Sequence, residues 1–290
     1  MIHEEEATHA VRTMCRALGV STSGYYSWRS RPESQRAVED RRLTVEIRAV
    51  HRESRGTYGA PRVHAELQDR GVACSKKRVA RLMREGSVSG KAPKRRKYGE
   101  PAGPLVPVAE NVLDRGFLPT APNRAWTADI TQIWTGEGWL YLAVVLDLFS
   151  RRVVGWATRP SLSRVLAVEA LQNALQSRRP APGLLHHSDQ GSQYTSHEYQ
   201  SLVRRAGLVP SMSRRGNCHD NAPTESFFGS LKAELVHGRR FETHAALRSA
   251  LFDYVETFYN TRRRHTSLGF LAPVAHEARH HAQQALTLAA

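Results

Sequence analysis

Three acidic residues that lie far apart in the chain could form one catalytic site. Asp129 lies inside a predicted strand, Asp189 directly follows another, and Glu225 lies in the first turns of a predicted helix. Two-metal phosphodiester chemistry needs carboxylate oxygens a few ångströms apart, which distant parts of a chain can supply. A charge inside an apolar strand is costly unless it is paired or binds a metal. We therefore consider all three acids candidate catalytic residues and metal ligands.

The elements that would position these acids alternate between strands and helices. Residues 124–134, 139–149 and 152–158 have the patterning of strands, and their short connections favour an antiparallel meander. The later elements are predicted as helices at 163–176, 196–206, 222–236, 244–259 and 272–290 and as strands at 183–187 and 208–212. The sequence thus predicts an α/β fold with Asp129 and Asp189 on its sheet. In helix 163–176 the residues expected to face inward are Val165, Leu166, Val168, Leu171 and Leu175.

Residues 37–90 have the pattern of a three-helix DNA-binding domain of the helix-turn-helix type. The signals, in chain order, are the apolar residues Leu43, Val45, Ile47 and Val50, then Pro61 and Gly71 at the ends of a second helix, and Ser75 and Gly86 at the ends of a third.

The third of these helices has a basic side and an apolar side. Its inward residues are expected to be Val79, Leu82 and Met83, and its basic residues are Lys76, Lys77, Arg78, Arg81 and Arg84. Such a surface fits a recognition helix in the major groove of double-stranded DNA. A solvated helix face is the alternative, although Glu85 is the only acid between Lys76 and Lys97.

Two further segments flank this domain. Residues 1–36 predict a helix at 8–17, a break at Gly19 and a second helix capped by Ser21, which fits a partial helix-turn-helix or an ordinary helical hairpin. Residues 91–117 are basic and rich in Gly and Pro, as is typical of a linker. This linker could follow a DNA backbone through Lys94, Arg95, Arg96 and Lys97, or be a solvated tether.

The composition favours a polyanionic partner. Lys and Arg number 42 against 27 Asp and Glu, which gives a net charge of +15. The three cysteines are far apart and support neither a disulfide framework nor a zinc ribbon. The sequence has no signal-peptide pattern and no membrane-length apolar run. We expect a cytoplasmic protein with no membrane partner.

Longer motifs around the acids resemble a known family. Residues 190–224, 35 in number, separate Asp189 from Glu225, and two aspartates followed at this distance by a glutamate resemble the acidic signature of retroviral integrases and related transposases. The segments 187–194 and 220–228, together with Tyr259, Asn260, Arg263, His265, Leu268, Gly269 and Pro273, resemble the second-frame transposases of the bacterial insertion sequence three group. The resemblance covers about residues 40–275 and includes Tyr58, Gly59 and Arg62.

This resemblance implies a ribonuclease-H-like integrase core, with a mixed five-stranded sheet flanked by helices, at residues 118–240 and a C-terminal helical extension at 241–290. It implies that Asp129, Asp189 and Glu225 bind two Mg²⁺ ions, for which Mn²⁺ could substitute. Lys232 matches a basic residue of the same signature and shares a helix face with Glu225, where it could contact a DNA phosphate.

The implied activity is metal-dependent cleavage at insertion-sequence ends followed by strand transfer. The implied location is the bacterial cytoplasm, in association with the nucleoid. The implied partners are the terminal inverted repeats and target DNA, a homo-oligomer of at least two copies, and the first-frame product of the same element, with which the active enzyme could be a frameshift fusion. A nuclease of the same fold that never joins strands is a rival interpretation. A DNA-binding regulator that needs none of the three acids is another.

Three neighbouring residues are weaker candidates. Asp147 could support the site or pair with Arg151 or Arg152. His187 and His219 border two of the acids, where capping or packing is the better interpretation. The paired histidines and cysteines of an integrase-type zinc module are missing from the sequence, so we expect no zinc site.

Overall fold

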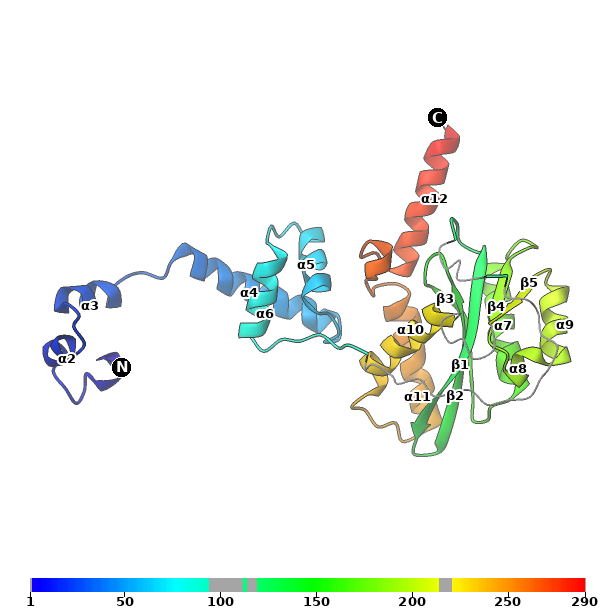
Figure 1. The fold of residues 1–290 in the computed structure, drawn as a ribbon, viewed down its shortest axis with the longest axis horizontal. Coiled ribbons are helices and arrows are strands. Elements are labelled where there is room, and N and C mark those ends of the chain that lie inside the picture. Colours follow the sequence, from blue (N-terminus) through cyan, green and yellow to red (C-terminus); the bar gives the residue numbers. More distant parts are fainter. Residues whose placement is uncertain (1, 94–111, 114–118, 214–220, 290) are drawn as a thin grey trace.

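The computed structural model describes residues 2–93, 112–113, 119–213 and 221–289. Figure 1 shows small N-terminal helices at one end, a three-helix module in the middle and an α/β core at the other end. The predicted basic positions Lys94, Arg95, Arg96 and Lys97 lie outside the described residues, as does His219. No helix in the described ranges is long and apolar enough to span a membrane.

The core is built on a mixed five-stranded sheet in the order β3-β2-β1-β4-β5. The strands are β1 (Ala125–Thr135), β2 (Gly138–Asp147), β3 (Val153–Arg159), β4 (Leu185–Ser188) and β5 (Val209–Met212). The first three pair antiparallel, which confirms the predicted meander, and β4 and β5 add in parallel. The predicted mixed sheet flanked by helices is confirmed.

The period of two along each strand divides the core into two layers. On β2, Leu140, Leu142, Val144 and Leu146 belong to one buried cluster, whereas Ala143 and Val145 belong to the other. The second cluster is covered by α7 (Arg164–Arg178), α8 (Ser192–Thr195) and α9 (His197–Arg205). The first is covered by α10 (Ala222–Leu231) and α11 (His244–Phe252) (Figure 1). A sheet with helices on both faces results.

Val165, which was expected to face inward, and Val45, one of the apolar residues that indicated the first helix of the 37–90 domain, are both exposed. Val165 on α7 is 36% exposed, whereas Leu166, Val168 and Leu171 are buried as predicted. Val45 is 67% exposed. Its helix buries positions 43, 47 and 50, which share one face at helical spacing, and position 45 points away from that face.

Two of the long predicted helices change their geometry before they end. α10 continues as the π-helical segment η2 (Lys232–Val236), and α11 continues as η3 (Asp253–Tyr259). The chain then forms a short turn, η4 (Thr266–Leu268), and the final helix α12 (Pro273–Ala289). π-helical turns are rare and are found mostly at functional sites.

The three-helix module consists of α4 (Gln35–Glu53), α5 (Ala60–Asp69) and α6 (Lys76–Glu85). Ser75 caps α6 by accepting a hydrogen bond from the Arg78 amide, and Pro61 lies in the first turn of α5, both as predicted. Val79, Leu82 and Met83 are buried, which confirms the inward face of α6.

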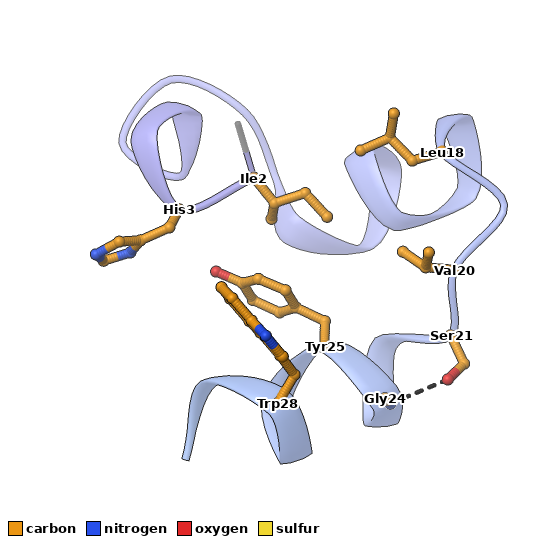
Figure 2. Close-up of a pocket in the computed structure, with 8 residues that line it drawn as sticks. All are labelled: Ile2, His3, Leu18, Val20, Ser21, Gly24, Tyr25 and Trp28. Atoms are coloured by element: carbon orange, nitrogen blue, oxygen red, sulfur yellow. Dashed lines mark hydrogen bonds between the residues drawn. The ribbon is translucent and has the colours of Figure 1, made fainter. Parts of the chain in front are cut away.

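The first helices, α1 (Ile2–Glu5), α2 (Val11–Ala17) and α3 (Thr22–Arg29), form a separate small body. Ser21 caps α3 through the Gly24 amide, as predicted. Ile2, Leu18, Val20, Tyr25 and Trp28 line a mostly apolar hollow of about 560 Å³ between these helices (Figure 2). None of the three candidate acids lines this hollow, so it is not the candidate active site.

The three-helix module contacts the core through long side chains. The Tyr58 hydroxyl donates a hydrogen bond to the Arg262 carbonyl and accepts one from the Arg264 amide. Arg264 forms ion pairs of 2.6 Å with both Glu66 and Asp69 of α5. Another ion pair joins Arg55 to Asp253 of η3. The module therefore packs against the C-terminal segment of the core.

Close packing of β3 against α7 generates a test of the fold. A Cβ atom on Gly155 would lie 2.4 Å from both the Ala170 carbonyl oxygen and the Ala174 amide nitrogen. We expect Gly155→Ala to reduce the free energy of unfolding by about 3 kcal/mol, because backbone atoms cannot yield as a flexible side chain would. The midpoint of urea unfolding measures this. In the matched control Gly229→Ala, the nearest atom of the described residues to the new methyl group is 3.4 Å away, and stability should be unchanged or slightly higher. Equal midpoints for the two variants would contradict the packing.

Candidate active site

Strand register places two of the acids side by side. β1 and β4 run parallel with Ala128 opposite Ser188, and Asp129 and Asp189 are the next residues along the two strands. Adjacent strands lie about 4.8 Å apart. Asp129 is therefore in mid-strand, and Asp189 is at the carboxyl end of the neighbouring strand, as the sequence predicts.

A buried polar contact brings the helix of the third acid to the same strand. Thr127 lies two residues before Asp129 and therefore on the same face of β1. Its hydroxyl donates a hydrogen bond of 2.6 Å to Asn221 and contacts the Thr224 hydroxyl. Asn221 also donates to the Ala128 carbonyl. The N-terminal end of α10, and with it Glu225, is thereby fixed over the face of β1 that carries Asp129.

The electrostatics of Asp129 reflect this convergence. Burial, the charge of Asp189 and the charge of Glu225 together raise the pKa of Asp129 from 3.8 to about 7, against a smaller lowering by the Ile130 amide and Lys232. Burial also raises the pKa of Asp189, although the Gly191 amide donates to its carboxylate. Glu225 and Lys232 thus lie near enough to Asp129 to change its proton affinity.

The three acids do not form a complete binding site for a single metal ion in this structure. Within the described residues, no three His, Cys, Asp or Glu side chains are close enough together to bind a single metal ion. One oxygen of Asp129 accepts a hydrogen bond of 2.7 Å from the Ile130 amide, and one of Asp189 accepts one of 2.9 Å from Gly191. The acids are close enough to affect the pKa of Asp129, but their oxygens do not form a common ligand sphere. Small side-chain rotations would change the ligand geometry without altering the fold.

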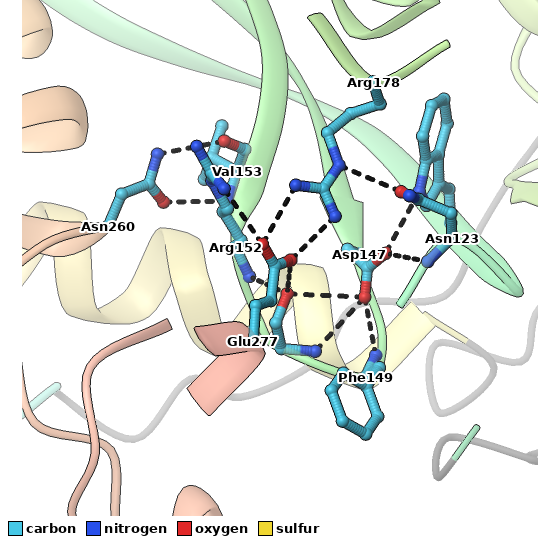
Figure 3. A network of polar contacts seen from close by, with 10 residues as sticks. Asn123, Asp147, Phe149, Arg152, Val153, Arg178, Asn260 and Glu277 are labelled. Carbon is cyan, nitrogen blue, oxygen red and sulfur yellow. Dashed lines mark hydrogen bonds and ion pairs between the residues drawn. The ribbon is translucent and has the colours of Figure 1, made fainter. Parts of the chain in front are cut away.

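Asp147 has a structural role at the end of β2. Its carboxylate accepts hydrogen bonds from the Asn123, Phe149 and Ser150 amides and from the Trp126 indole. The predicted alternative partner Arg152 pairs instead with Glu277 of α12 (Figure 3). This network holds the end of β2 beside β1, at a distance from the three acids.

Two buried residues near the acids were not predicted as site residues. Tyr194 of α8 is 2% exposed, and its hydroxyl has no hydrogen-bond partner within the part of the chain that the structure describes. Burial, Tyr199, Asp129 and Asp189 raise its pKa well above 10. The other is Thr127. Its position two residues before Asp129 in a strand was the available signal. His187, by contrast, is held by Ser211 and Ser213 inside the sheet, a packing role.

The basic residues of α6 divide into two groups. Lys76, Lys77 and Arg84 are exposed. Arg78 and Arg81 both form ion pairs of 2.6 Å with Asp40 of α4, and they also pair with Glu39 and Glu85 respectively. These two arginines therefore brace the three-helix module in the protein alone.

Comparisons with known proteins agree with this architecture. An integrase core domain family matches residues 119–218, and a second integrase core domain family matches 225–280. An HTH-like domain family matches residues 38–97. Transposase InsF for insertion sequence IS3A of Escherichia coli (strain K12) is 40% identical over 275 residues, which cover 94% of this chain and 95% of that protein. The chain belongs to the IS3 family of transposases.

Other similarities extend the comparison. The insertion element IS600 uncharacterized 31 kDa protein of Shigella sonnei is 42% identical to this transposase over 268 residues, covering 92% of this chain and 98% of that protein. The catalytic core domain of BIV integrase is 20% identical and covers 56% of this transposase and 98% of that chain, with a TM-score of 0.42, a likeness too weak to bear on the site.

The perturbed carboxyl group gives the transposase a characteristic pH dependence. Because the pKa of Asp129 is raised to about 7, the folded protein retains a proton between about pH 4 and pH 7 that the unfolded chain has lost. Its free energy of unfolding should therefore fall as the pH rises through this window. Asp129→Asn removes the titrating group, so this variant should lose less stability between pH 5 and pH 8 in the presence of a chelator. Melting temperatures across this range test the point, with Glu169→Gln on α7 as control, and parallel curves for wild type and Asp129→Asn would contradict it.

The Glu277 network has the opposite pH dependence. Although burial raises its pKa, hydrogen bonds from Arg178, Ser150 and Arg152 leave the pKa of Glu277 below its ordinary value of 4.5. Its contribution to stability is therefore complete above about pH 5 and is lost as the pH falls through the lowered pKa. We expect Glu277→Gln to cost about 2 to 3 kcal/mol at pH 7, since the buried Arg178 loses its counter-charge.

Urea unfolding at pH 7 and at pH 3.5 provides the measurement for Glu277→Gln. The difference from wild type should shrink at the lower pH. Glu198→Gln is the matched control, because Glu198 forms an exposed ion pair with Arg164 that contributes less than about 1 kcal/mol. A deficit for Glu277→Gln that is equal at both pH values would show that its charge is not the stabilising feature.

Proposed function

We propose that this protein cleaves DNA at the ends of its insertion sequence and transfers the released strands to a target, with Asp129, Asp189 and Glu225 as a catalytic triad of carboxylates. The observation that supports this most strongly is the placement of Asp129 and Asp189 on neighbouring parallel strands, with the start of α10 fixed over Asp129, where Asp189 and Glu225 both raise the pKa of Asp129. Burying repelling carboxylates opposes folding, so such a cluster fits a role that requires negative charge at this position.

Divalent cations fit this donor set. The carboxylates are hard oxygen ligands of the kind that Mg²⁺ and Mn²⁺ prefer, and we propose that Asp129, Asp189 and Glu225 hold two Mg²⁺ ions. When bound, such ions activate an attacking oxygen and stabilise a leaving one. The chain's own contribution is to bring the half-buried Asp129 close to the other two carboxylates, while Lys232 lies where it could contact a DNA phosphate.

The protein would also bind DNA at surfaces distant from the active site. We propose that exposed Lys76, Lys77 and Arg84 contact phosphates or base edges first, and that Arg78 and Arg81 exchange their pairing with Asp40 for DNA. The basic residues 94–97 are proposed to follow the DNA backbone. Synapsis of two ends calls for at least two copies of the chain. The first-frame product of the element is proposed as a further partner.

Replacing one acid separates catalysis from binding. Asp129→Asn keeps the size of the side chain but removes a ligand charge. We expect cleavage and strand transfer to fall at least about 1,000-fold, while DNA affinity stays within about threefold of wild type. The assay uses DNA carrying the ends that flank the gene, with Mg²⁺ or with chelator, and both intact and pre-cut ends.

The outcomes distinguish the rival functions. The control Glu169→Gln, an acid on α7 paired with Arg159, should retain full activity. Cleavage of intact ends without joining of pre-cut ends would indicate a nuclease of the same fold. Mg²⁺-independent binding that is indifferent to all three acids, with no cleavage, would indicate a DNA-binding regulator. Substantial strand transfer by Asp129→Asn would refute the carboxylate mechanism.

A further inference from the structure

A polar cavity, distinct from the apolar hollow between the N-terminal helices, lies beside the helix that carries Glu225. It has a volume of about 370 Å³ and is lined by Pro223, Ser226 and Ser230 of α10 and by residues from three other parts of the chain. Ser226 and Ser230 are four residues apart and share a helix face adjacent to Glu225. The cavity therefore opens next to the candidate active site but does not include its acids.

Three arginines from distant segments line this cavity. Arg62 comes from α5 of the three-helix module, Arg151 from the turn after β2, and Arg263 from the segment after η3. His265 also lines it, and all three guanidinium groups lie near enough to influence this ring. Burial followed by the charges of Arg263, Arg62 and Arg151 keeps the pKa of His265 well below 6.5, so the ring is neutral at pH 7.

Two of the guanidinium groups that line the cavity share a single carboxylate, that of Glu234. Glu234 of η2 is 5% exposed and accepts hydrogen bonds of 2.8 and 2.7 Å from Arg263. It lies 3.8 Å from Arg62, so one carboxylate serves two guanidinium groups. Burial, followed by repulsion from Arg263, lowers the pKa of Arg62. None of the described residues that line the cavity is acidic.

From this geometry we infer that the cavity binds one backbone phosphate of the DNA strand that enters the active site. Arginine forks match phosphate oxygens, and the hydroxyl groups of Ser226 and Ser230 add further donors. An α-helix with its side chains is about 10 Å across, so a phosphate here is two or three nucleotides from the scissile one. The inference rests on the proposed function and adds a positioning subsite to it.

The subsite also links the two DNA-contacting parts of the chain. Arg62 reaches the cavity only while the three-helix module is docked on the core, and Lys91 at the end of this module donates a hydrogen bond to the Glu234 carbonyl. The same phosphate would thus be held by a residue of the module and by residues of the core. DNA bound there favours the docked arrangement.

The test measures binding in the Asp129→Asn background, so that it does not depend on whether the protein cleaves DNA. Duplexes carry the element end with a single neutral methylphosphonate at each linkage within about five nucleotides of the cleavage site. We expect one linkage at which neutralisation weakens binding about tenfold. Adding Arg62→Gln should weaken binding to unmodified DNA by a similar factor and abolish the sensitivity at that linkage. It should also reduce the slope of log affinity against log salt by about 1.

Matched variants separate charge from packing. Arg62→Lys should recover part of the affinity and of the salt slope. Arg205→Gln, an exposed arginine on α9, should leave the methylphosphonate pattern intact. Because Arg62 also lies over the Tyr58 ring, Arg151→Gln provides a second route if Arg62→Gln unfolds.

Two results would overturn the inference. One is an unchanged methylphosphonate pattern in folded Arg62→Gln and Arg151→Gln. The other is a rise in melting temperature with inorganic phosphate when no linkage is sensitive, which would assign the cavity to free phosphate. Failure of cleavage by the wild-type protein would count against the proposed function alone, since the binding scan does not use it.

Discussion

The attachment of α10 to β1 is the constraint on which the candidate site depends. Thr127, Asn221 and Thr224 form a buried cluster of hydrogen bonds between a strand and a helix that are almost 100 residues apart. Parallel pairing of β1 with β4 already places Asp129 beside Asp189. Phe227, Phe228 and Leu231 pack α10 on the sheet, and the Thr127 cluster fixes where the helix starts relative to Asp129. Buried polar contacts, which are costly unless every group is hydrogen-bonded, thus align acids that repel one another.

The sequence predicted those features that repeat along the chain or that stand at fixed spacing. Alternation identified the strands, and the position of Asp129 within one of them followed directly. Spacing alone could not predict which side chains from different helices and strands contact each other. The pairing of Arg78 with Asp40, and the contact of Thr127 with α10, arise only when separate helices and strands meet. Val45 helped to indicate its helix, but its exposure shows that residue type alone does not identify the buried face. The closing of three acids around metal ions, and the domain boundaries, stay predictions.

The three-helix module packs directly against the core, a contact that the domain pattern of the sequence does not predict. Tyr58 bridges the backbone at Arg262 and Arg264, and the side chain of Arg264 returns to α5. Glu234 lies where this contact meets the π-helical continuation of α10. A π-helical turn places an extra residue in the helix, and here it lies between Glu225 on α10 and Glu234, which faces the three-helix module. The module and the core therefore share one buried polar cluster around Glu234.

The contribution of residues 241–289 to the core has a consequence for gene copies that have begun to decay. α11 and η3 supply Leu247, Leu251, Tyr254, Val255 and Phe258 to the cluster under the sheet. A premature stop codon shortly after position 240 would leave all three acids encoded, yet it would remove this layer and the docking surface of the module. The presence of the acids in a genomic copy is thus a poor guide to whether that copy encodes a folded protein. An intact reading frame through the C-terminal helices is the better indicator.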